Sequence, residues 1–244
     1  MTNSTKDQLY AAKQDKVDDF VFDENVATVF ADMIQRSVPG YVALNQLLPT
    51  VANSFIRPGT NVYDLGCSLG EATLAIANAI QYDDVKIIAV DNSQAMIQQL
   101  EERITASDLK IFIKPICSDV VENNIENASF VVLNYTLQFI DWAQRDELIA
   151  RVYSGLQEDG ALLLAEKIIY EDAEEEALMQ QLHENFKRDN NYSDLEISQK
   201  REALENVLVR DTHEQHIKRL YQAGFSKIFI LAKYLNFISY VAVK

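Results

Sequence analysis

The sequence predicts an α/β fold with a doubly wound, mostly parallel, seven-stranded sheet, a C-terminal antiparallel strand pair and a helical insertion. Three observations support this prediction. Over residues 60–165, short and continuously apolar runs alternate with amphipathic helical stretches, which is typical of parallel strands covered on both faces. Two more apolar runs, 225–232 and 235–243, follow one another closely and predict an antiparallel hairpin. Between these parts the alternation stops, and residues 170–210 have a helical pattern.

Two helices are predicted before the sheet. Apolar residues recur at helical spacing after Asp23, which is a suitable N-cap, and the Ser-Val-Pro-Gly break at 37–40 ends this helix. A second helix is expected over 41–55, with Pro49 as the position of a kink. The alternating core then contains predicted strands at 60–65, 86–90, 110–116, 128–133 and 161–165, and predicted helices at 69–80, 93–106 and 143–155.

The insertion and the two ends of the chain complete the domain prediction. Helices are predicted at 171–188 and 193–208, and the second begins with a capping-box pattern from Ser193 to Glu196. A last helix ends before Gly224, a natural C′ residue. Residues 1–20 are polar with weak periodicity, so we expect a flexible N-terminal arm. We expect a single domain over 21–244, with N-terminal helices at about 23–56 and the insertion at about 170–210.

Composition limits the class of protein. The chain has 244 residues, with 22 Lys and Arg against 37 Asp and Glu, and its formal net charge is −15. A field of this sign repels a phosphate backbone, so we expect no direct binding of nucleic acid. No run approaches the roughly 18 apolar residues of a spanning helix, and no secretory signal stands at the N-terminus. With only two cysteines there is no disulfide framework, so we expect a cytoplasmic protein without membrane contact.

Polar residues follow four consecutive predicted strands. The first strand ends in Asp64 and continues into a glycine-containing turn at 66–70 that opens a helix, where backbone N–H groups face a ligand. Asp91 ends the second strand, at the position where a carboxylate accepts hydrogen bonds from both hydroxyls of a ribose. Asp119 follows the third strand and Asn134 ends the fourth. Each alone is more simply a turn or cap residue, but the set predicts a nucleoside site at the carboxyl edge of the sheet.

Charge separates two nucleoside ligands. Ser68 stands where a dinucleotide-binding turn has its middle glycine, and Asp64 precedes the turn on the strand itself. A carboxylate at that point repels a pyrophosphate and suits the positively charged amino-acid end of S-adenosylmethionine. The sequence therefore favours S-adenosylmethionine over NAD.

Longer stretches resemble known proteins. The Asp-Leu-Gly-x-x-x-Gly turn, the second-strand acid and the terminal antiparallel pair resemble the Rossmann-like fold of class I S-adenosylmethionine-dependent methyltransferases. From about residue 18 onward, the chain closely resembles the carboxy-S-adenosyl-L-methionine synthase family. The stretches that carry this second resemblance are 22–27, 33–41, 62–70, 91–93, 137–139 and 195–201.

The resemblance implies an enzyme that converts S-adenosyl-L-methionine and prephenate to carboxy-S-adenosyl-L-methionine and releases phenylpyruvate. Its product would pass to a separate tRNA carboxymethyltransferase that modifies a wobble uridine. The resemblance also implies that Arg201 pairs with the transferred carboxylate as the catalytic residue. The ligand-binding residues it implies are Tyr41, Gly66, Cys67, Ser68, Asp91, Asn92, Asp119, Val120, Asn134 and Arg201.

Arg201 is also notable from the pattern alone. With Ile197, Leu204 and Leu208 it falls on one face of the predicted helix, so its guanidinium either extends to solvent or meets a buried anion. An ordinary methyltransferase has no carboxylate on its sulfonium for such a group to recognise. The insertion holds more apolar residues than a surface helix pair needs, which predicts a homodimer interface there. The sequence leaves open whether Arg201 serves its own site or that of its neighbour.

No protein base stands out in the sequence. His183, His213 and His216 fall on helices expected at the surface, which leaves the substrate itself as a candidate proton acceptor. Cys67 and Cys117 are predicted to be small buried fillers, and no spacing of His, Cys, Asp or Glu indicates a metal. Two alternatives stay open: a methyltransferase acting on an anionic small molecule, and a non-catalytic S-adenosylmethionine-binding protein.

Overall fold

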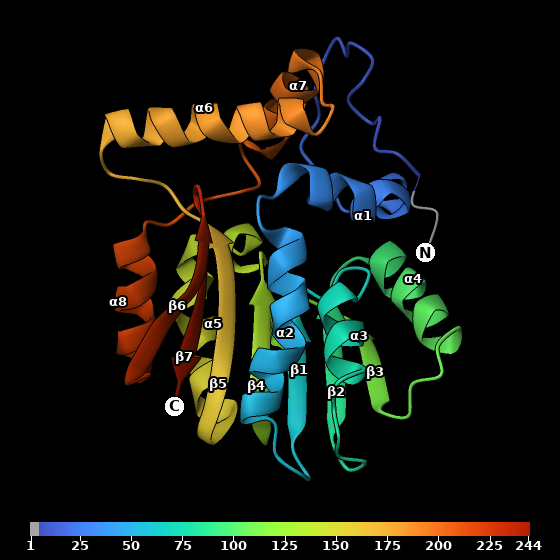
Figure 1. The fold of residues 1–244 in the computed structure, drawn as a ribbon, viewed down its shortest axis with the longest axis vertical. Coiled ribbons are helices and arrows are strands. Elements are labelled where there is room, and N and C mark those ends of the chain that lie inside the picture. Colours follow the sequence, from blue (N-terminus) through green and yellow to red (C-terminus); the bar gives the residue numbers. More distant parts are fainter. Residues whose placement is uncertain (1–4) are drawn as a thin grey trace.

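The structure is a computed structural model that describes residues 5–244. Its centre is one seven-stranded sheet. Its strands are β1 (Asn61–Leu65), β2 (Lys86–Asp91), β3 (Phe112–Cys117), β4 (Ala128–Asn134), β5 (Leu156–Lys167), β6 (Lys227–Tyr234) and β7 (Phe237–Val243). They are ordered β3-β2-β1-β4-β5-β7-β6 (Figure 1). Strands β1 to β5 pair in parallel, and β7 is antiparallel to both β5 and β6. This order confirms the predicted fold class.

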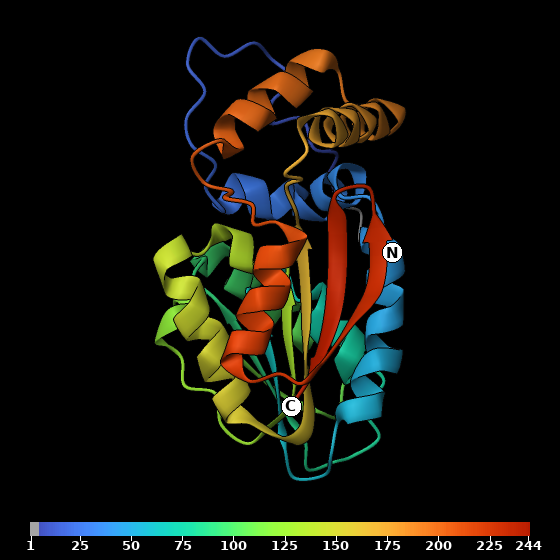
Figure 2. The same cartoon turned by 90° about the vertical axis from the view of Figure 1, so that its left-hand side faces the viewer.

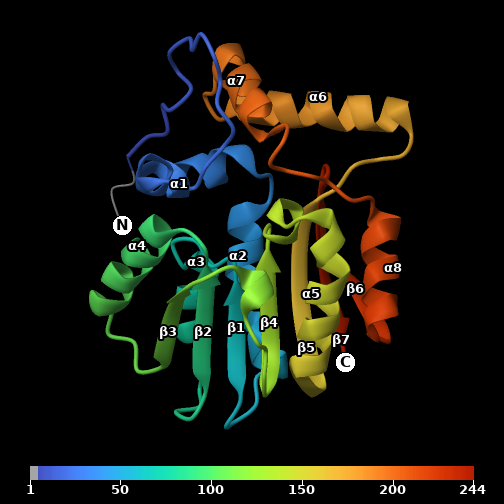
Figure 3. The ribbon, with the colours of Figure 1, turned by 180° about the vertical axis from the view of Figure 1, so that it is seen from behind.

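Helices cover both faces of the sheet. One face carries α2 (Tyr41–Phe55), α3 (Glu71–Ala77) and α4 (Gln94–Thr105), and the other carries α5 (Trp142–Gly155) and α8 (His213–Ala223) (Figures 1 and 3). Successive strand residues point to opposite faces: Val62 and Phe130 pack in the first apolar cluster, and Tyr63 and Val131 in the second. Each face therefore buries its own core, which explains why the strands are apolar throughout.

A third layer lies over the carboxyl edge of the parallel strands. It contains α1 (Glu24–Ser37) and the two helices of the insertion, α6 (Ala173–Asp189) and α7 (Asp194–Leu204) (Figures 1 and 2). The expected caps are present: Asp23 accepts a hydrogen bond from the Val26 N–H, and Ser193 and Glu196 form the capping box of α7. None of the helices that residues 5–244 form combines the length and the apolar character needed to cross a bilayer.

Residues 5–23, which we call the N-terminal strap, lie along this third layer. The Asp7 carboxylate accepts a hydrogen bond from the Tyr192 hydroxyl at 2.5 Å, and the Gln14 N–H donates to the Gln199 side chain at 2.7 Å. The Phe20 N–H donates to the Ala203 carbonyl at 2.9 Å. A flexible arm was expected over residues 1–20. Residues 1–4 lie outside the described part of the chain, and the remaining residues are attached to the third layer by these hydrogen bonds.

Three of the differences from the predicted element bounds have a clear physical cause. Helix α3 begins only at Glu71, because Ser68 and Gly70 have left-handed backbone angles that no α-helix accepts. Helix α7 ends at Leu204, since the chain turns back toward the sheet and the Val209 N–H donates to the Gln138 carbonyl at 3.0 Å. Strand β5 begins at Leu156, earlier than predicted, with a shift in its register against β4.

Candidate active site

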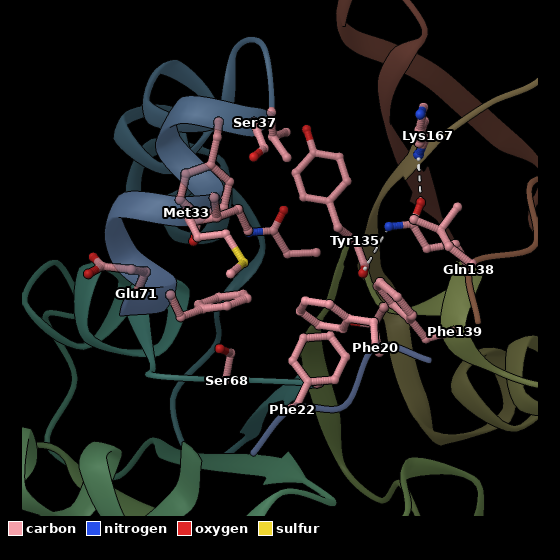
Figure 4. A pocket seen from close by; sticks show the side chains of 18 of the residues that line it. Phe20, Phe22, Met33, Ser37, Ser68, Glu71, Tyr135, Gln138, Phe139 and Lys167 are labelled. Carbon is pink, nitrogen blue, oxygen red and sulfur yellow. Dashed lines mark hydrogen bonds between the residues drawn. The ribbon is translucent and has the colours of Figure 1, made fainter. Parts of the chain in front are cut away.

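A cavity of about 340 Å³ lies between the carboxyl edge of the parallel strands and the third layer. Its lower wall is built by the loops that follow β1 to β5, and its upper wall by the strap, α1, α6 and α7. Figure 4 shows part of the lining, with Ser68 at one side and Lys167 across the opening. The predicted ligand residues that line it are Tyr41, Gly66, Cys67, Ser68, Asp91, Asn92, Asp119, Val120 and Asn134.

The turn after β1 exposes its backbone to the cavity. The N–H groups of Gly66 and Cys67 donate to the Val90 carbonyl at 2.7 and 3.0 Å, which attaches the turn to β2. The expectation that the N–H groups of this turn face a ligand is therefore wrong for these two residues. Gly66 has a φ of +80°, and a Cβ built there would lie 2.4 Å from side-chain atoms of Thr136. Only glycine fits both conditions, so the strand, the turn and Thr136 can pack closely beside a ligand.

Asp91 joins the loops after β1 and β2. Its two carboxylate oxygens accept hydrogen bonds from the N–H groups of Ser68 and Ser93, each at 2.9 Å. Burial raises the pKa of Asp91, and the two N–H donors oppose that rise. Each oxygen keeps a free lone pair, so the carboxylate can also accept from two neighbouring hydroxyl groups, as a ribose presents them.

Two further polar side chains face the cavity beside this turn. Asp64 accepts a hydrogen bond from the Thr73 hydroxyl at 2.5 Å, and burial raises its pKa to about 6. The Asn134 Oδ1 is buried and has no hydrogen-bond partner among the described residues. An unsatisfied buried acceptor costs roughly 1–3 kcal/mol, so this oxygen fits a donor that a ligand brings, such as an ammonium group.

The middle of the cavity is aromatic. Phe20 and Phe22 of the strap lie 5.0 Å apart between ring centroids, and Phe22 lies 5.3 Å from Phe139. Figure 4 shows these rings between Ser68 and Tyr135. These aromatic residues were not predicted from the sequence. Phe20 and Phe22 belong to a segment with the pattern of an irregular arm, and they become part of the site only because that segment packs over the sheet edge.

The wall opposite the Asp91 loops is basic. Lys167 ends β5, Lys187 lies on α6 and Lys200 on α7, and all three line the cavity. Burial lowers the pKa of Lys167 and Lys200 to about 7 and that of Lys187 to about 8. Lys167 could have been found from the sequence by extending the strand-end argument to a fifth strand. The other two lie on the insertion, and no local pattern places them at the site.

The histidine and cysteine predictions need correction. His183 and His216 are buried, with 5% and 1% of their surface exposed, because α6 folds over the sheet edge and α8 packs against β7. His183 lines the cavity; its Nε2 donates to the Ser37 carbonyl at 2.7 Å, and burial lowers its pKa so far that the ring is neutral. Cys67 is buried as predicted, but Cys117 at the end of the edge strand β3 is exposed.

Arg201 does not line the cavity. Its side chain is 61% exposed and its Nη1 lies 3.1 Å from Glu184 Oε1 on α6. The apolar face expected for residues 197–208 is cut short at the end of α7, although Leu204 and Leu208 both reach the cavity wall. The role of Arg201 therefore stays a prediction.

Comparison with known proteins identifies the family. Residues 62–160 match a family model described as a methyltransferase domain. The carboxy-S-adenosyl-L-methionine synthase of Shewanella amazonensis is 49% identical over 246 residues, which cover 100% of both chains. That of Escherichia fergusonii is 48% identical over 241 residues, covering 99% of this chain and 98% of the other. This chain belongs to the carboxy-S-adenosyl-L-methionine synthase family.

Solved structures of proteins with low sequence identity to this chain have the same fold. An O-methyltransferase family protein from Burkholderia thailandensis has a TM-score of 0.62 at 16% identity, with 91% of this chain and 60% of that chain covered. Human N-acetylserotonin methyltransferase, solved in complex with S-adenosylmethionine, has a TM-score of 0.60 at 16% identity, with 91% and 55% covered. The methyltransferase fold is thus shared.

The cavity of this family member is suited to two ligands of opposite charge. Asp64, Asp91 and Asp119 lie at one end, and Lys167, Lys187 and Lys200 at the other. Acidic groups attract a cationic nucleoside and basic groups attract an anion, so both ligands can meet over the aromatic middle. Among residues 5–244, no group of three or more His, Cys, Asp or Glu side chains is arranged to hold a metal ion.

Proposed function

We propose that this protein converts S-adenosyl-L-methionine and prephenate to carboxy-S-adenosyl-L-methionine, phenylpyruvate and water. The observation that carries the proposal is the two-ended charge of the cavity, in a chain 48–49% identical to synthases of that name. S-adenosylmethionine carries positive charge on its sulfonium and ammonium groups, and prephenate carries two carboxylates. Each substrate therefore has an end of the cavity with the opposite charge.

The acidic end has the groups that the nucleoside needs. In our proposal Asp91 and Asn92 bind the ribose, and Asp119 and Val120 bind the adenine. The backbone of Gly66, Cys67 and Ser68, with Asn134 and Tyr41, binds the methionine part. The unpartnered Asn134 Oδ1 supports this arrangement, because an ammonium group would satisfy it.

The chemistry balances with the two substrates alone. The bond between the prephenate ring and its carboxylate breaks, and its electron pair makes the ring aromatic as the ring hydroxyl group leaves. The hydroxide takes a proton from the sulfonium methyl group and becomes water. The methyl carbon then forms its new bond to the CO2 just released, and the site holds these groups in contact. Since His183 is neutral with a strongly lowered pKa, it is a poor base, which favours the substrate as proton acceptor.

We further propose that the protein is a homodimer through its insertion. Leu178, Leu182 and Leu195 are 50%, 37% and 38% exposed on α6 and α7, which is consistent with an apolar contact between two copies. In this dimer, Arg201 of one copy pairs with the transferred carboxylate in the cavity of the other. Its exposure and its position outside its own cavity favour that arrangement over a role in its own site.

Mixing two inactive variants tests the role of Arg201. Arg201→Ala should abolish carboxyl transfer, and Asp91→Ala should abolish nucleoside binding. A heterodimer of the two has one site with both groups intact, so co-refolding or co-expression should restore activity to about a quarter of wild type by random pairing. Activity that stays absent in a verified heterodimer would contradict a role across the interface.

We also propose that the reaction takes place in the cytoplasm and that its product passes to a separate tRNA carboxymethyltransferase. The formal net charge of −15 fits an enzyme that handles only the small molecule, because such a field disfavours contact with tRNA.

Mass spectrometry tests the proposed function directly. The purified protein is gently denatured and its small molecules are extracted, and a second sample is first incubated with S-adenosylmethionine and prephenate. We expect a sulfonium nucleoside heavier than S-adenosylmethionine by one CO2, and stoichiometric phenylpyruvate in the second sample. S-adenosylhomocysteine with no phenylpyruvate would instead indicate a methyltransferase. Bound S-adenosylmethionine without any turnover would indicate a non-catalytic protein.

A further inference from the structure

Three lysines from three separate elements form one wall of the cavity. Lys167 ends β5, Lys187 lies on α6 and Lys200 on α7; we call this set the lysine wall. All three line the same cavity, and the charge of Lys187 contributes to the lowered pKa of both Lys167 and Lys200, for which burial is the main cause. Gathering three ammonium groups in a partly desolvated place is unfavourable unless an anion joins them.

Few acidic or hydrogen-bond-accepting groups of the protein itself contact these three ammonium groups. Lys200 donates to the Ser37 hydroxyl at 3.0 Å and lies 3.9 Å from the Asp7 carboxylate. Within residues 5–244, the ammonium groups of Lys167 and Lys187 have neither a hydrogen-bond acceptor nor an ion-pair partner, and the Lys167 ammonium lies over the Phe237 ring at 5.7 Å from its centroid.

Two further acids near this wall, Glu176 and Glu184, are already paired with arginines. Glu184 lies 3.1 Å from Arg201, and Glu176 lies 2.6 Å from Arg210. These carboxylates attract the lysines from a distance but do not neutralise them. In a chain with a formal net charge of −15, an unneutralised cationic cluster inside a cavity points to a bound anion.

We propose that the lysine wall binds the carboxylate of the 2-oxo acid side chain of the second substrate. This inference rests on the proposed function and adds to it the residues that select and orient that substrate. Anchoring the side chain at Lys167 and Lys187 directs the six-membered ring toward Phe20, Phe22 and Phe139. The second carboxylate, on the ring, then lies in the aromatic middle of the cavity, facing the sulfonium at the acidic end.

This orientation separates the roles of the two carboxylates. The one on the lysine wall has charge-assisted hydrogen bonds and stays with the product phenylpyruvate. The one on the ring leaves water for an apolar surface, where a localised negative charge is poorly solvated and its release as CO2 is favoured. Aromatisation already selects the ring carboxylate for release, and Lys167 and Lys187 orient the substrate so that this carboxylate faces the sulfonium.

Binding of phenylpyruvate tests the subsite without turnover. Phenylpyruvate keeps the 2-oxo acid and lacks the ring carboxylate, so it probes the lysine wall alone. Isothermal titration into protein saturated with S-adenosylmethionine compares wild type with Lys167→Met, Lys187→Met and the double variant. Methionine keeps the length of the side chain and removes its charge. We expect each single change to weaken phenylpyruvate binding about 10-fold and the double change about 100-fold or more, from the loss of charge-assisted hydrogen bonds.

Matched controls exclude a general effect of charge or folding. Lys218→Met removes an exposed lysine on α8 and should leave phenylpyruvate binding unchanged. The dissociation constant for S-adenosylhomocysteine should stay within about twofold of wild type in every variant, because the nucleoside end is intact. Lys167→Arg, which keeps the charge, should recover part of the lost binding.

The outcomes separate the two proposals. Phenylpyruvate binding that is absent from wild type, or unchanged in the double variant, overturns the lysine wall as a subsite, even where carboxy-S-adenosylmethionine is formed. A wild-type protein that binds both ligands and forms no carboxylated nucleoside overturns the proposed function, while the loss of binding in the methionine variants still supports the anion site.

Discussion

Two clusters of buried charge in this molecule have opposite organisation. In the first, the Asp211 carboxylate lies 2.9 Å from Arg145 and 2.7 Å from Arg219, and these side chains are 1%, 1% and 5% exposed. Arg145 also donates to the carbonyls of Gln138 and Val209, so its guanidinium is fully used. In the second, the lysine wall, two of the three ammonium groups have no partner among residues 5–244. The first cluster stabilises the fold, and the second is completed only by a ligand.

Hydrogen bonding distinguishes buried charges with a structural role from those with a role in binding. Both clusters are cationic in excess, and both are at least partly shielded from water, so their charge and location alone do not explain their roles. The difference is in hydrogen bonding: the Arg145–Asp211–Arg219 cluster joins α5, α8 and the segment between α7 and α8 through satisfied donors. The lysine wall lines a cavity, and some of its N–H donors have no acceptor in the described part of the chain. These unpaired donors lower the stability of the ligand-free protein, and a bound ligand can offset that loss.

Breaking the paired cluster should have the largest effect on stability. Asp211→Asn leaves two buried guanidinium groups without a carboxylate, and we expect the free energy of unfolding to fall by about 3–5 kcal/mol. Urea unfolding followed by circular dichroism measures this change. Glu214→Gln, at an exposed position on α8, is the control and should change stability by less than about 0.5 kcal/mol. A loss of similar size in both variants would show that the paired cluster has no special structural role.

The fold, and the gathering of the strand-end acids at one cavity, could be predicted from the sequence for one physical reason. Strands, helix caps and strand-end turns are local patterns, and parallel topology brings the strand ends Asp64, Asp91 and Asn134 together without further information. The third layer is different. Its position depends on contacts between distant segments, such as that of Phe20 with Ala203, so the aromatic middle and two of the lysines were not predictable from spacing.

Arg201 shows the same limit. Its predicted apolar face assumed a helix continuing to residue 208, but a tertiary hydrogen bond to Gln138 replaces the last turn. The side chain instead meets Glu184 on the neighbouring helix. Periodicity could identify a basic residue on the same helix face as apolar ones. It could not predict toward which part of the molecule the folded insertion directs that side chain.

The pH dependence of substrate binding should have an intermediate effect. With pKa values of about 7 for Lys167 and Lys200 and about 8 for Lys187, the wall is partly protonated at neutral pH and loses its remaining protons as the pH rises. We therefore expect the KM for prephenate to rise about 10-fold between about pH 7 and pH 9. The charged groups that face the wall from the surrounding elements are Asp7, Asp32, Arg36, Glu176, Glu184, Arg201 and Arg210.

Steady-state kinetics with each substrate varied in turn measures this dependence. The KM for S-adenosylmethionine is the internal control: Asp64, with a pKa of about 6, is ionised throughout this range. Parallel rises of both KM values would point to a general loss of structure at high pH. A KM for prephenate that stays constant would show that the lysines do not need their charge for binding.

The smallest predicted effect is a gain in stability. The folded-state pKa of Lys167 is about 7, against an ordinary value of 10.5, so between these values the unfolded chain binds more protons and the charge opposes folding. Lys167→Met should raise the free energy of unfolding of the ligand-free protein by about 1 kcal/mol at neutral pH, since part of the side chain stays hydrated in the cavity. The gain should fade as the pH approaches 10.5. It should also disappear at saturating phenylpyruvate, because the anion binds the wild type about 10-fold more tightly and so stabilises it by up to about 1.4 kcal/mol more than the variant. If Lys167→Met destabilises the protein at neutral pH, Lys167 belongs with the paired arginines as a structural charge, and the contrast between the two clusters fails.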